Sequence, residues 1–336
     1  MIFLGEQKEA LEKYRSVMLC WMKIKLRGKF HANNNPGGHN CNSPTCNVCS
    51  ANIKRKTTLD PRFVDCFSDN TLNLLISAKP TYLGLIQDHI LRPAFLGRGL
   101  TENEFKQQSK MLFVTSGYEG YFYEKMNYRL AEWLDIHTCT YCNRQYIFVV
   151  RKSNGLKGIV PQFDHWFSKS DYPILALSFY NLIPSCGICN SSIKSDARLT
   201  LNDHLHPYVD IDISDTFKFS YLAISPTEYE IICRRSSIYN VKSRNTLAAM
   251  ETKLLYKGHS NKELQDLIDL RYKYSDNYLN ILLNKTFANL NITKSDRYRM
   301  VFGIEIDKEN YHKRPFSKFK KDILDELMRS TSQNSP

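Results

Sequence analysis

The stretch that decides the fold runs Cys139-Thr-Tyr-Cys142, then Phe163-Asp164-His165-Trp166, and closes with Asn181-Leu-Ile-Pro-Ser-Cys186-Gly-Ile-Cys189-Asn190. Two Cys-x2-Cys pairs therefore enclose an acid, a histidine and an asparagine. Four thiolates at such spacing fill the tetrahedral shell of a structural zinc ion and leave no position for water. The sequence predicts a zinc site, made by Cys139, Cys142, Cys186 and Cys189, that clamps a segment too small for a robust core of its own.

Strand-forming residues occupy 145–150 and 158–163, between the two cysteine pairs. A turn at 152–155 would join them, because Lys, Ser, Asn and Gly stand there. Asp164 and His165 would then lie where the second strand ends. Asn190 is a suitable first residue for a helix that reaches Lys194, so the expected unit is ββα.

The order Asp164-His165, Asn181, Asn190 between two zinc knuckles resembles the HNH endonuclease motif, in its variant with Asn at the third signature position. The resemblance covers roughly residues 137–208. In the identity and order of its residues, the stretch is similar to the HNH nucleases of Septu-type bacterial anti-phage systems. It implies an α+β protein with a zinc-stabilised ββα-metal core, flanked by predominantly helical regions. It also implies a possible ATPase partner, since nucleases of that type work beside one.

The resemblance assigns roles residue by residue. His165 would be the general base and Asn181 would orient it, while Asp164 and Asn190 would bind one Mg²⁺ or Mn²⁺ through oxygen, the ligand atom such cations prefer. Where colicin-type members carry histidines at the metal positions, this chain carries Asp164 and Asn190. The residues expected to contact phosphate are Arg144, Lys169 and Lys194.

The composition of the chain limits the kinds of partner that can be expected. The chain has 336 residues with 46 Lys and Arg against 34 Asp and Glu, so a polyanion such as nucleic acid is expected, although charge alone does not separate it from an anionic membrane surface. We expect DNA rather than RNA. The N-terminus turns charged after four residues and no apolar run approaches about 20 residues, so we expect no leader, no membrane span and a reducing cytoplasmic location. No Walker-type loop is present, which argues against an intrinsic ATPase.

Residues 1–130 are expected to be mainly helical, with an amphipathic helix at 5–27 and a Cys-rich loop at 31–50. The loop could hold a second zinc ion, because short Cys and His spacings place several ligands within tetrahedral reach. Free thiols in a flexible insert are the alternative. The candidate ligands are Cys41, Cys46, Cys49 and either His39 or His31.

Residues 131–215 form the expected nuclease domain, and residues 216–329 are expected to form a hairpin followed by helices. His204 and His206 are predicted to lie in a surface turn. The basic and aromatic segment 308–321 suits either phosphate contact or a solvated helix face, and residues 330–336 are predicted to be disordered. The buried positions expected between residues 243 and 285 are Leu264, Leu267, Ile268, Tyr278, Ile281 and Leu282.

The functional expectation is a metal-dependent endonuclease that hydrolyses phosphodiester bonds, in bacterial anti-phage defence. Two alternatives remain open. The chain could be a zinc-ribbon nucleic-acid-binding protein without catalysis, or an effector subunit that is silent until a partner ATPase activates it.

Overall fold

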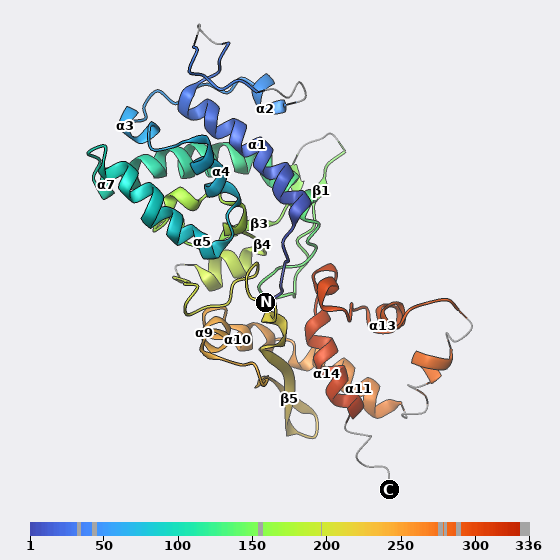
Figure 1. The fold of residues 1–336 in the computed structure, drawn as a ribbon. Coiled ribbons are helices and arrows are strands. Elements are labelled where there is room, and N and C mark those ends of the chain that lie inside the picture. The colour runs from blue at the N-terminus through green and yellow to red at the C-terminus, as the bar shows by residue number, and fades with distance from the viewer. Residues whose placement is uncertain are drawn as a thin grey trace.

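The protein combines helices with small sheets, as Figure 1 shows for the computed structural model. The structure describes residues 1–31, 35–41, 46–153, 157–195, 197–274, 278, 281–286 and 290–329. Part of the turn predicted at 152–155, and all of the tail at 330–336, lie outside these ranges. Among the described helices, none has the length and apolar character that a membrane crossing requires.

Helices make up the N-terminal region, as the sequence predicts. The longest is α1 (Lys8–Arg27), which buries Tyr14, Met18 and Trp21 on one face and stops at Gly28, whose φ of 77° suits glycine. The others are α2 (Asn47–Ser50), α3 (Pro61–Val64), α4 (Asp69–Ser77), α5 (Pro80–Leu85), η1 (Ile86–Leu91), α6 (Arg92–Leu96), α7 (Glu102–Ser109), η2 (Lys110–Met126) and α8 (Asn127–Leu134).

The central region pairs its strands differently from the prediction. Strand β1 (Val150–Arg151) pairs with β2 (Lys157–Ile159), but β3 (Gln162–His165) pairs antiparallel with β4 (Leu182–Ser185), so that Asp164 faces Ile183 across the ladder. The strand that carries Asp164 and His165 is thus separate from the 150–159 ribbon, because its partner comes from the segment after Asn181. Short helical turns complete the region: η3 (Pro173–Leu175), η4 (Phe179–Asn181), η5 (Ile188–Lys194) and η6 (Ile213–Asp215).

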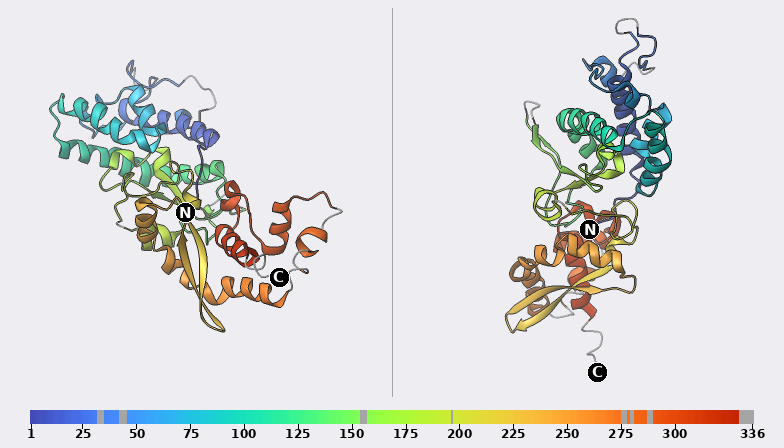
Figure 2. Two further views of the ribbon diagram at one scale, coloured as in Figure 1. Left: turned by 60° about the horizontal axis from the view of Figure 1, so that its bottom comes forward. Right: turned by 90° about the vertical axis from the view of Figure 1, so that its left-hand side faces the viewer.

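The C-terminal region begins with the predicted hairpin, β5 (Phe217–Ser225) and β6 (Glu228–Arg235). Both views in Figure 2 show it extending away from the N-terminal helices. Leu264, Leu267 and Ile268 are buried as predicted, but Tyr278 and Ile281 are exposed and Leu282 is only partly buried. The helices are α9 (Val241–Ala249), α10 (Thr252–Lys257), η7 (Ser260–Leu264), α11 (Gln265–Lys273), η8 (Ile281–Lys285), α13 (Lys294–Phe302), η9 (Lys308–Lys313) and α14 (Ser317–Arg329).

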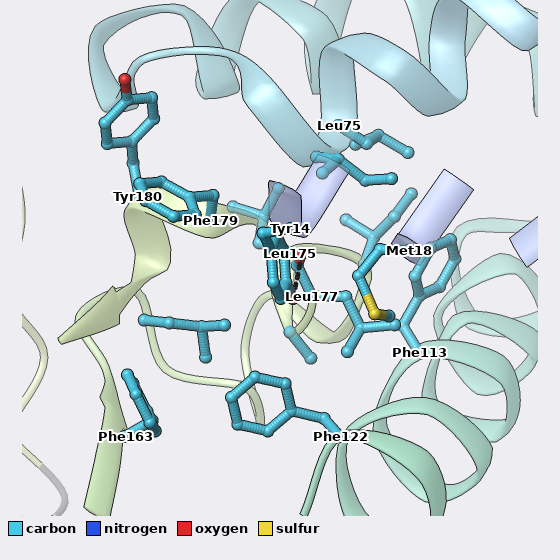
Figure 3. Close-up of a cluster of buried hydrophobic side chains, with 14 of the residues drawn as sticks. Tyr14, Met18, Leu75, Phe113, Phe122, Phe163, Leu175, Leu177, Phe179 and Tyr180 are labelled. Carbon is cyan, nitrogen blue, oxygen red and sulfur yellow. Dashed lines mark hydrogen bonds between the residues drawn. The ribbon is translucent and has the colours of Figure 1, made fainter. Parts of the chain in front are cut away.

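The N-terminal helices and the central region share one apolar core, drawn in Figure 3. Tyr14 of α1 donates a hydrogen bond from its hydroxyl to the carbonyl of Leu177 (3.0 Å). Ser178 donates its hydroxyl to the carbonyl of Leu75 in α4 (2.5 Å). Helices that are distant in sequence therefore hold the segment just before Asn181. A second core lies between the β5–β6 hairpin and α14.

Two predictions about polar residues need correction. His206 is fully buried rather than in a surface turn, with its ring 4.5 Å from that of Trp166. The segment 308–321 is neither a solvated face nor open to phosphate along its length, because Phe319 lies in the second core and Lys318 is buried in an ion pair with Asp322 (2.6 Å). The alternation of basic and aromatic residues in this segment therefore results from the packing of α14 against the second core.

Candidate functional site: a buried polar centre and two cysteine clusters

Strand β3 places Asp164 and His165 beside Asn181, and η5 adds Lys194. Antiparallel pairing sets the register, with His165 opposite Leu182, the residue after Asn181. All four side chains are buried, with exposed fractions of 5% for Asp164, 7% for His165, 0% for Asn181 and 4% for Lys194. Residues 30 positions apart in sequence thus form one polar centre within an apolar core.

Asp164 is held from both sides. Its Oδ1 accepts a hydrogen bond from Lys194 Nζ (3.1 Å), and its Oδ2 accepts one from the hydroxyl of Tyr141 (2.5 Å). Burial raises the pKa of the Asp164 carboxyl, while Lys194 and Tyr141 oppose that shift. Lys194 also donates to the carbonyl of His165 (2.7 Å), so its ammonium fixes this turn of the chain.

His165 has a defined tautomer in this arrangement. Its Nε2 lies 3.0 Å from the carbonyl oxygen of Ala176, which can only accept, so Nε2 carries the proton and Nδ1 keeps a lone pair. Burial lowers the pKa of His165 to about 3. The ring of Tyr118 from η2 packs edge-on against the imidazole at 4.2 Å, and its hydroxyl donates to Phe163 (2.7 Å). The imidazole is therefore neutral at physiological pH and fixed in orientation.

Asn181 fastens the loop that supplies the Ala176 carbonyl. Its Nδ2 donates to the carbonyls of Phe167 (3.2 Å) and Leu175 (3.0 Å), and its Oδ1 accepts from the Phe167 amide (2.7 Å). An amide side chain can donate and accept at once, which a carboxylate cannot do. Asn181 thus orients His165 through the backbone and does not contact the imidazole.

Asn190 lies in η5 and points its amide nitrogen at Gln162 Oε1 (2.8 Å). Its carbonyl oxygen remains as the potential ligand atom. Among the described residues, no hydrogen bond joins Asn190 to Asp164. Carboxylate and amide oxygens suit a hard divalent cation by chemistry, but the Lys194 ammonium already neutralises Asp164 here.

The other two residues expected at phosphate are engaged elsewhere. Arg144 donates to the Leu255 carbonyl (2.8 Å) and lies against the ring of Tyr256, so it joins the central and C-terminal regions. Lys169 pairs with Glu119 (3.2 Å) above the ring of Tyr118 (5.1 Å). Lys169 is about two-fifths exposed, and it lies at the edge of the His165 environment.

The structure brings the four knuckle cysteines together. The Sγ atoms of Cys139, Cys142, Cys186 and Cys189 all lie within 4.8 Å of one another and are buried. Hydrogen bonds from the Cys139, Cys186 and Cys189 thiols lower the pKa of Cys142, whereas burial raises the pKa of Cys139. This cluster could hold a structural metal such as zinc. Tyr141 stands between two of its members, so the cluster also positions the phenol that holds Asp164.

A second cluster could also hold a structural metal, with a different membership from the expected one. Ligand atoms of Cys20, His39, Cys41 and Cys49 lie within 4.8 Å of one another. Cys20 comes from the middle of α1, with its Sγ 3.7 Å from that of Cys41. His39 Nε2 is buried without a hydrogen-bond partner in the described structure. A nitrogen atom that coordinates a metal ion would have this environment.

Cys46 borders this second cluster. Burial opposes its ionisation, but backbone amides of Cys49 and Val48 and the thiols of Cys49 and Cys20 together lower its pKa. Cys46, which the sequence predicts as a ligand, is not among the residues whose ligand atoms lie within 4.8 Å of one another. The other expected candidate, His31, is exposed and packs against the ring of Phe30.

Sequence reasoning missed Cys20, Tyr118 and Tyr141. The role of Tyr141 could have been predicted, since this residue lies between Cys139 and Cys142. The roles of Cys20 and Tyr118 could not, because each reaches its site from a helix far away in the chain. No family model matches this sequence, and comparison with curated proteins and with solved structures returns no match either.

Proposed function

We propose that this protein is a metal-dependent endonuclease of the HNH type, with its reaction centre at Asp164, His165, Asn181 and Asn190. The observation that supports it most is the neutral, oriented His165, whose Nε2 is tied to Ala176 while Nδ1 keeps its lone pair. A fixed imidazole with a free lone pair is what a general base acting on water needs. Burial lowers the pKa of His165 to about 3, so water has to enter the centre before the ring can take a proton efficiently. The resemblance to HNH nucleases supplies the reaction, phosphodiester hydrolysis.

Each residue has a role in this proposal. His165 Nδ1 takes the proton of the attacking water, and Asn181 keeps His165 oriented by holding the loop that ends at Ala176. Asp164 and Asn190 offer the oxygen atoms for Mg²⁺ or Mn²⁺. A bound cation would stabilise charge on the phosphate and on the leaving oxygen. Lys194, which now neutralises Asp164, would then be available to pair with phosphate.

The charge of the chain is distributed in keeping with this proposal. Residues 131–215 contain 7 Lys and Arg against 9 Asp and Glu, whereas residues 1–130 contain 18 against 11 and residues 216–329 contain 21 against 14. The positive excess lies outside the region that carries the reaction centre. Attraction of the polyanion would therefore come from the flanks, with DNA as the expected substrate.

The decisive experiment incubates supercoiled plasmid, together with single- and double-stranded DNA and RNA, with the protein in Mg²⁺, Mn²⁺ or EDTA. We expect metal-dependent cleavage that falls by at least about 100-fold in His165→Ala, the range typical for loss of a general base. His89→Ala, an exposed histidine in η1, should cleave like the wild type. Equal cleavage by wild type and His165→Ala would remove the catalytic assignment.

The closed state of the centre favours a second candidate, an effector subunit that requires activation. Asp164, His165 and Lys194 are each less than a tenth exposed, so a phosphodiester cannot reach them without a rearrangement. This candidate predicts no cleavage by the protein alone and cleavage after a partner ATPase is added. Nucleic-acid binding without cleavage under either condition would instead favour the non-catalytic zinc-ribbon protein.

A further inference from the structure

The ribbon that contains β1 and β2 exposes an apolar face. In the segment that leads into β1, Tyr146, Phe148 and Val150 are exposed and Ile147 is buried. The exposed fractions are 51% for Tyr146, 41% for Phe148, 40% for Val150 and 59% for Ile159. Ile159 is the direct cross-strand neighbour of Val150, so it belongs to the same face. A half-buried ribbon would ordinarily turn polar side chains outward there.

Two of these four side chains are aromatic, and they are neighbours. The rings of Tyr146 and Phe148 lie 5.2 Å apart with 57° between their planes. They stand two residues apart in the segment just before β1. Adjacent exposed rings can each accept one base of a nucleic-acid strand.

The charged residues of the ribbon indicate an anionic partner. Residues 144–162 contain four Lys and Arg and no Asp or Glu. Arg144 and Arg151 are engaged with neighbouring segments, the latter with Glu132 (2.7 Å), whereas Lys152 is exposed at the end of the strand. An aromatic face without a single acidic residue is complementary to a polyanion that carries stackable rings.

The ribbon is joined directly to the reaction centre. At its base, Tyr146 forms a bridge with Thr138 and Ile147 donates its amide to His137, next to the first zinc knuckle. At its other end, β2 continues through Pro161 into Gln162, the first residue of β3. The ribbon is therefore continuous in sequence with the strand that carries Asp164, and Arg151 of β1 anchors it to Glu132 of α8 (2.7 Å).

We propose that this face, made of Tyr146, Phe148, Val150 and Ile159, binds unpaired bases of a nucleic-acid strand by stacking. This inference rests on the proposed nuclease function and narrows its substrate to nucleic acid with single-stranded character. Stacking needs open base faces, which a continuous duplex does not present. Tyr146 and Phe148 receive the bases, and the two aliphatic side chains exclude water beside them.

The test measures binding separately from cleavage. Labelled 20-nucleotide single strands of dT and dA, and a duplex of the same length, are titrated by fluorescence anisotropy in EDTA with the full chain carrying His165→Ala. We expect the single strands to bind at least about tenfold more tightly than the duplex. Adding Tyr146→Ser with Phe148→Ser should weaken single-strand binding by at least about 30-fold, since the two stacked bases together contribute at least about 2 kcal/mol.

A matched control replaces two equally exposed side chains on α5, Tyr82→Ser with Leu85→Ser, whose exposed fractions are 57% and 53%. This control should bind single strands like its parent. Circular dichroism and zinc content should be the same for both double variants, because the replaced side chains lie at the surface.

Unchanged binding by Tyr146→Ser with Phe148→Ser, or an equal loss in the α5 control, would overturn the inference. So would unchanged binding combined with a change in oligomeric state, which would make the face a contact between copies of this chain. Because EDTA and His165→Ala exclude cleavage, a binding loss supports the face even if the wild type proves not to be a nuclease. Conversely, cleavage that depends on His165 but not on the two rings would leave the nuclease proposal intact.

Discussion

Asp164 shows how one buried charge is tolerated in an apolar core. Its two oxygens accept from Lys194 and Tyr141, so that neither the carboxylate nor the ammonium is left unpaired. Removing one partner of such a pair leaves an uncompensated charge away from water. The structure of the centre therefore depends on Lys194.

The replacement Lys194→Met should lower the free energy of unfolding by about 3–5 kcal/mol, the usual result of breaking a buried ion pair while the aliphatic stem is kept. Lys169→Met is the control, because its pair with Glu119 is solvent-exposed and contributes at most about 1 kcal/mol. Urea denaturation of both variants and the wild type measures the difference. Equal losses in the two variants would show that Lys194 is not paired as the structure has it.

His206 predicts a dependence of stability on pH. Burial lowers its pKa to about 3, and its Nδ1 accepts a hydrogen bond from the Tyr208 amide. Between pH 6.5 and 3 the unfolded chain therefore binds a proton that the folded chain does not. The free energy of unfolding should fall as the pH falls through this window, by up to about 1.4 kcal/mol per pH unit from this residue.

The replacement His206→Gln should flatten that dependence, measured as the slope of the free energy of unfolding between pH 6.5 and 5. His165 contributes in the same direction, so a residual slope is expected in the variant. His89→Gln, at an exposed position, should keep the wild-type slope. A variant slope equal to that of the wild type would contradict the burial of a neutral His206.

At the scale of elements, the second cysteine cluster ties α1 to the loop that follows it. Gly38 allows that loop to pass close to the end of α1, because a Cβ at this position would lie only 2.5 Å from the backbone of Lys29. His39 is then held by its amide on the Gly28 carbonyl (2.8 Å). The loop reaches Cys20 as a result, and a metal at this cluster would fasten it to α1.

Zinc content should separate the two clusters. We expect two zinc ions per wild-type chain by mass spectrometry or atomic emission, and one in Cys20→Ala. Cys66→Ala, which removes a buried thiol that hydrogen-bonds Arg62 outside both clusters, should retain two. One zinc ion in the wild type would mean that the second cluster consists of free thiols.

Elements whose pattern is local were predictable. The β5–β6 hairpin follows from alternation over consecutive residues, and α1 follows from helical spacing of Tyr14, Met18 and Trp21. The pairing of β3 was not predictable in this way, since 16 residues separate it from β4 and a nearer strand-forming segment was available. Pairing over a distance depends on the packing around both strands, which periodicity does not encode.

At the scale of the whole molecule, Asn143 joins the first cysteine cluster to the C-terminal region. Its Nδ2 donates to the carbonyls of Tyr311 (2.9 Å) and Arg314 (3.1 Å), and its φ of 51° directs the turn. Tyr256 adds a hydrogen bond from its hydroxyl to the Cys142 carbonyl (2.6 Å). The two apolar cores thus meet at the first cysteine cluster.

Asn143→Ala should lower the free energy of unfolding of the C-terminal region by about 2–3 kcal/mol. The replacement removes two or three buried hydrogen bonds and leaves alanine at positive φ. Hydrogen exchange should become faster in the β5–β6 hairpin and α14, with less change in α1 and α4. Asn103→Ala, at an exposed position in α7, should leave the exchange pattern unchanged. Unchanged protection of the hairpin in Asn143→Ala would show that the C-terminal region does not depend on this contact.

The sequence by itself determined the residues of the first cysteine cluster, because the spacing of two Cys-x2-Cys pairs restricts which side chains short turns can bring together. It also determined the helical N-terminal region and the late hairpin, whose apolar periods are local. Only the tertiary structure decided that Cys20 joins the second cluster, that Tyr118 packs on His165, that Tyr141 and Lys194 pair with Asp164 and that Arg144 faces the C-terminal region. Each of these contacts unites separate segments, and only the burial of a shared core places them side by side.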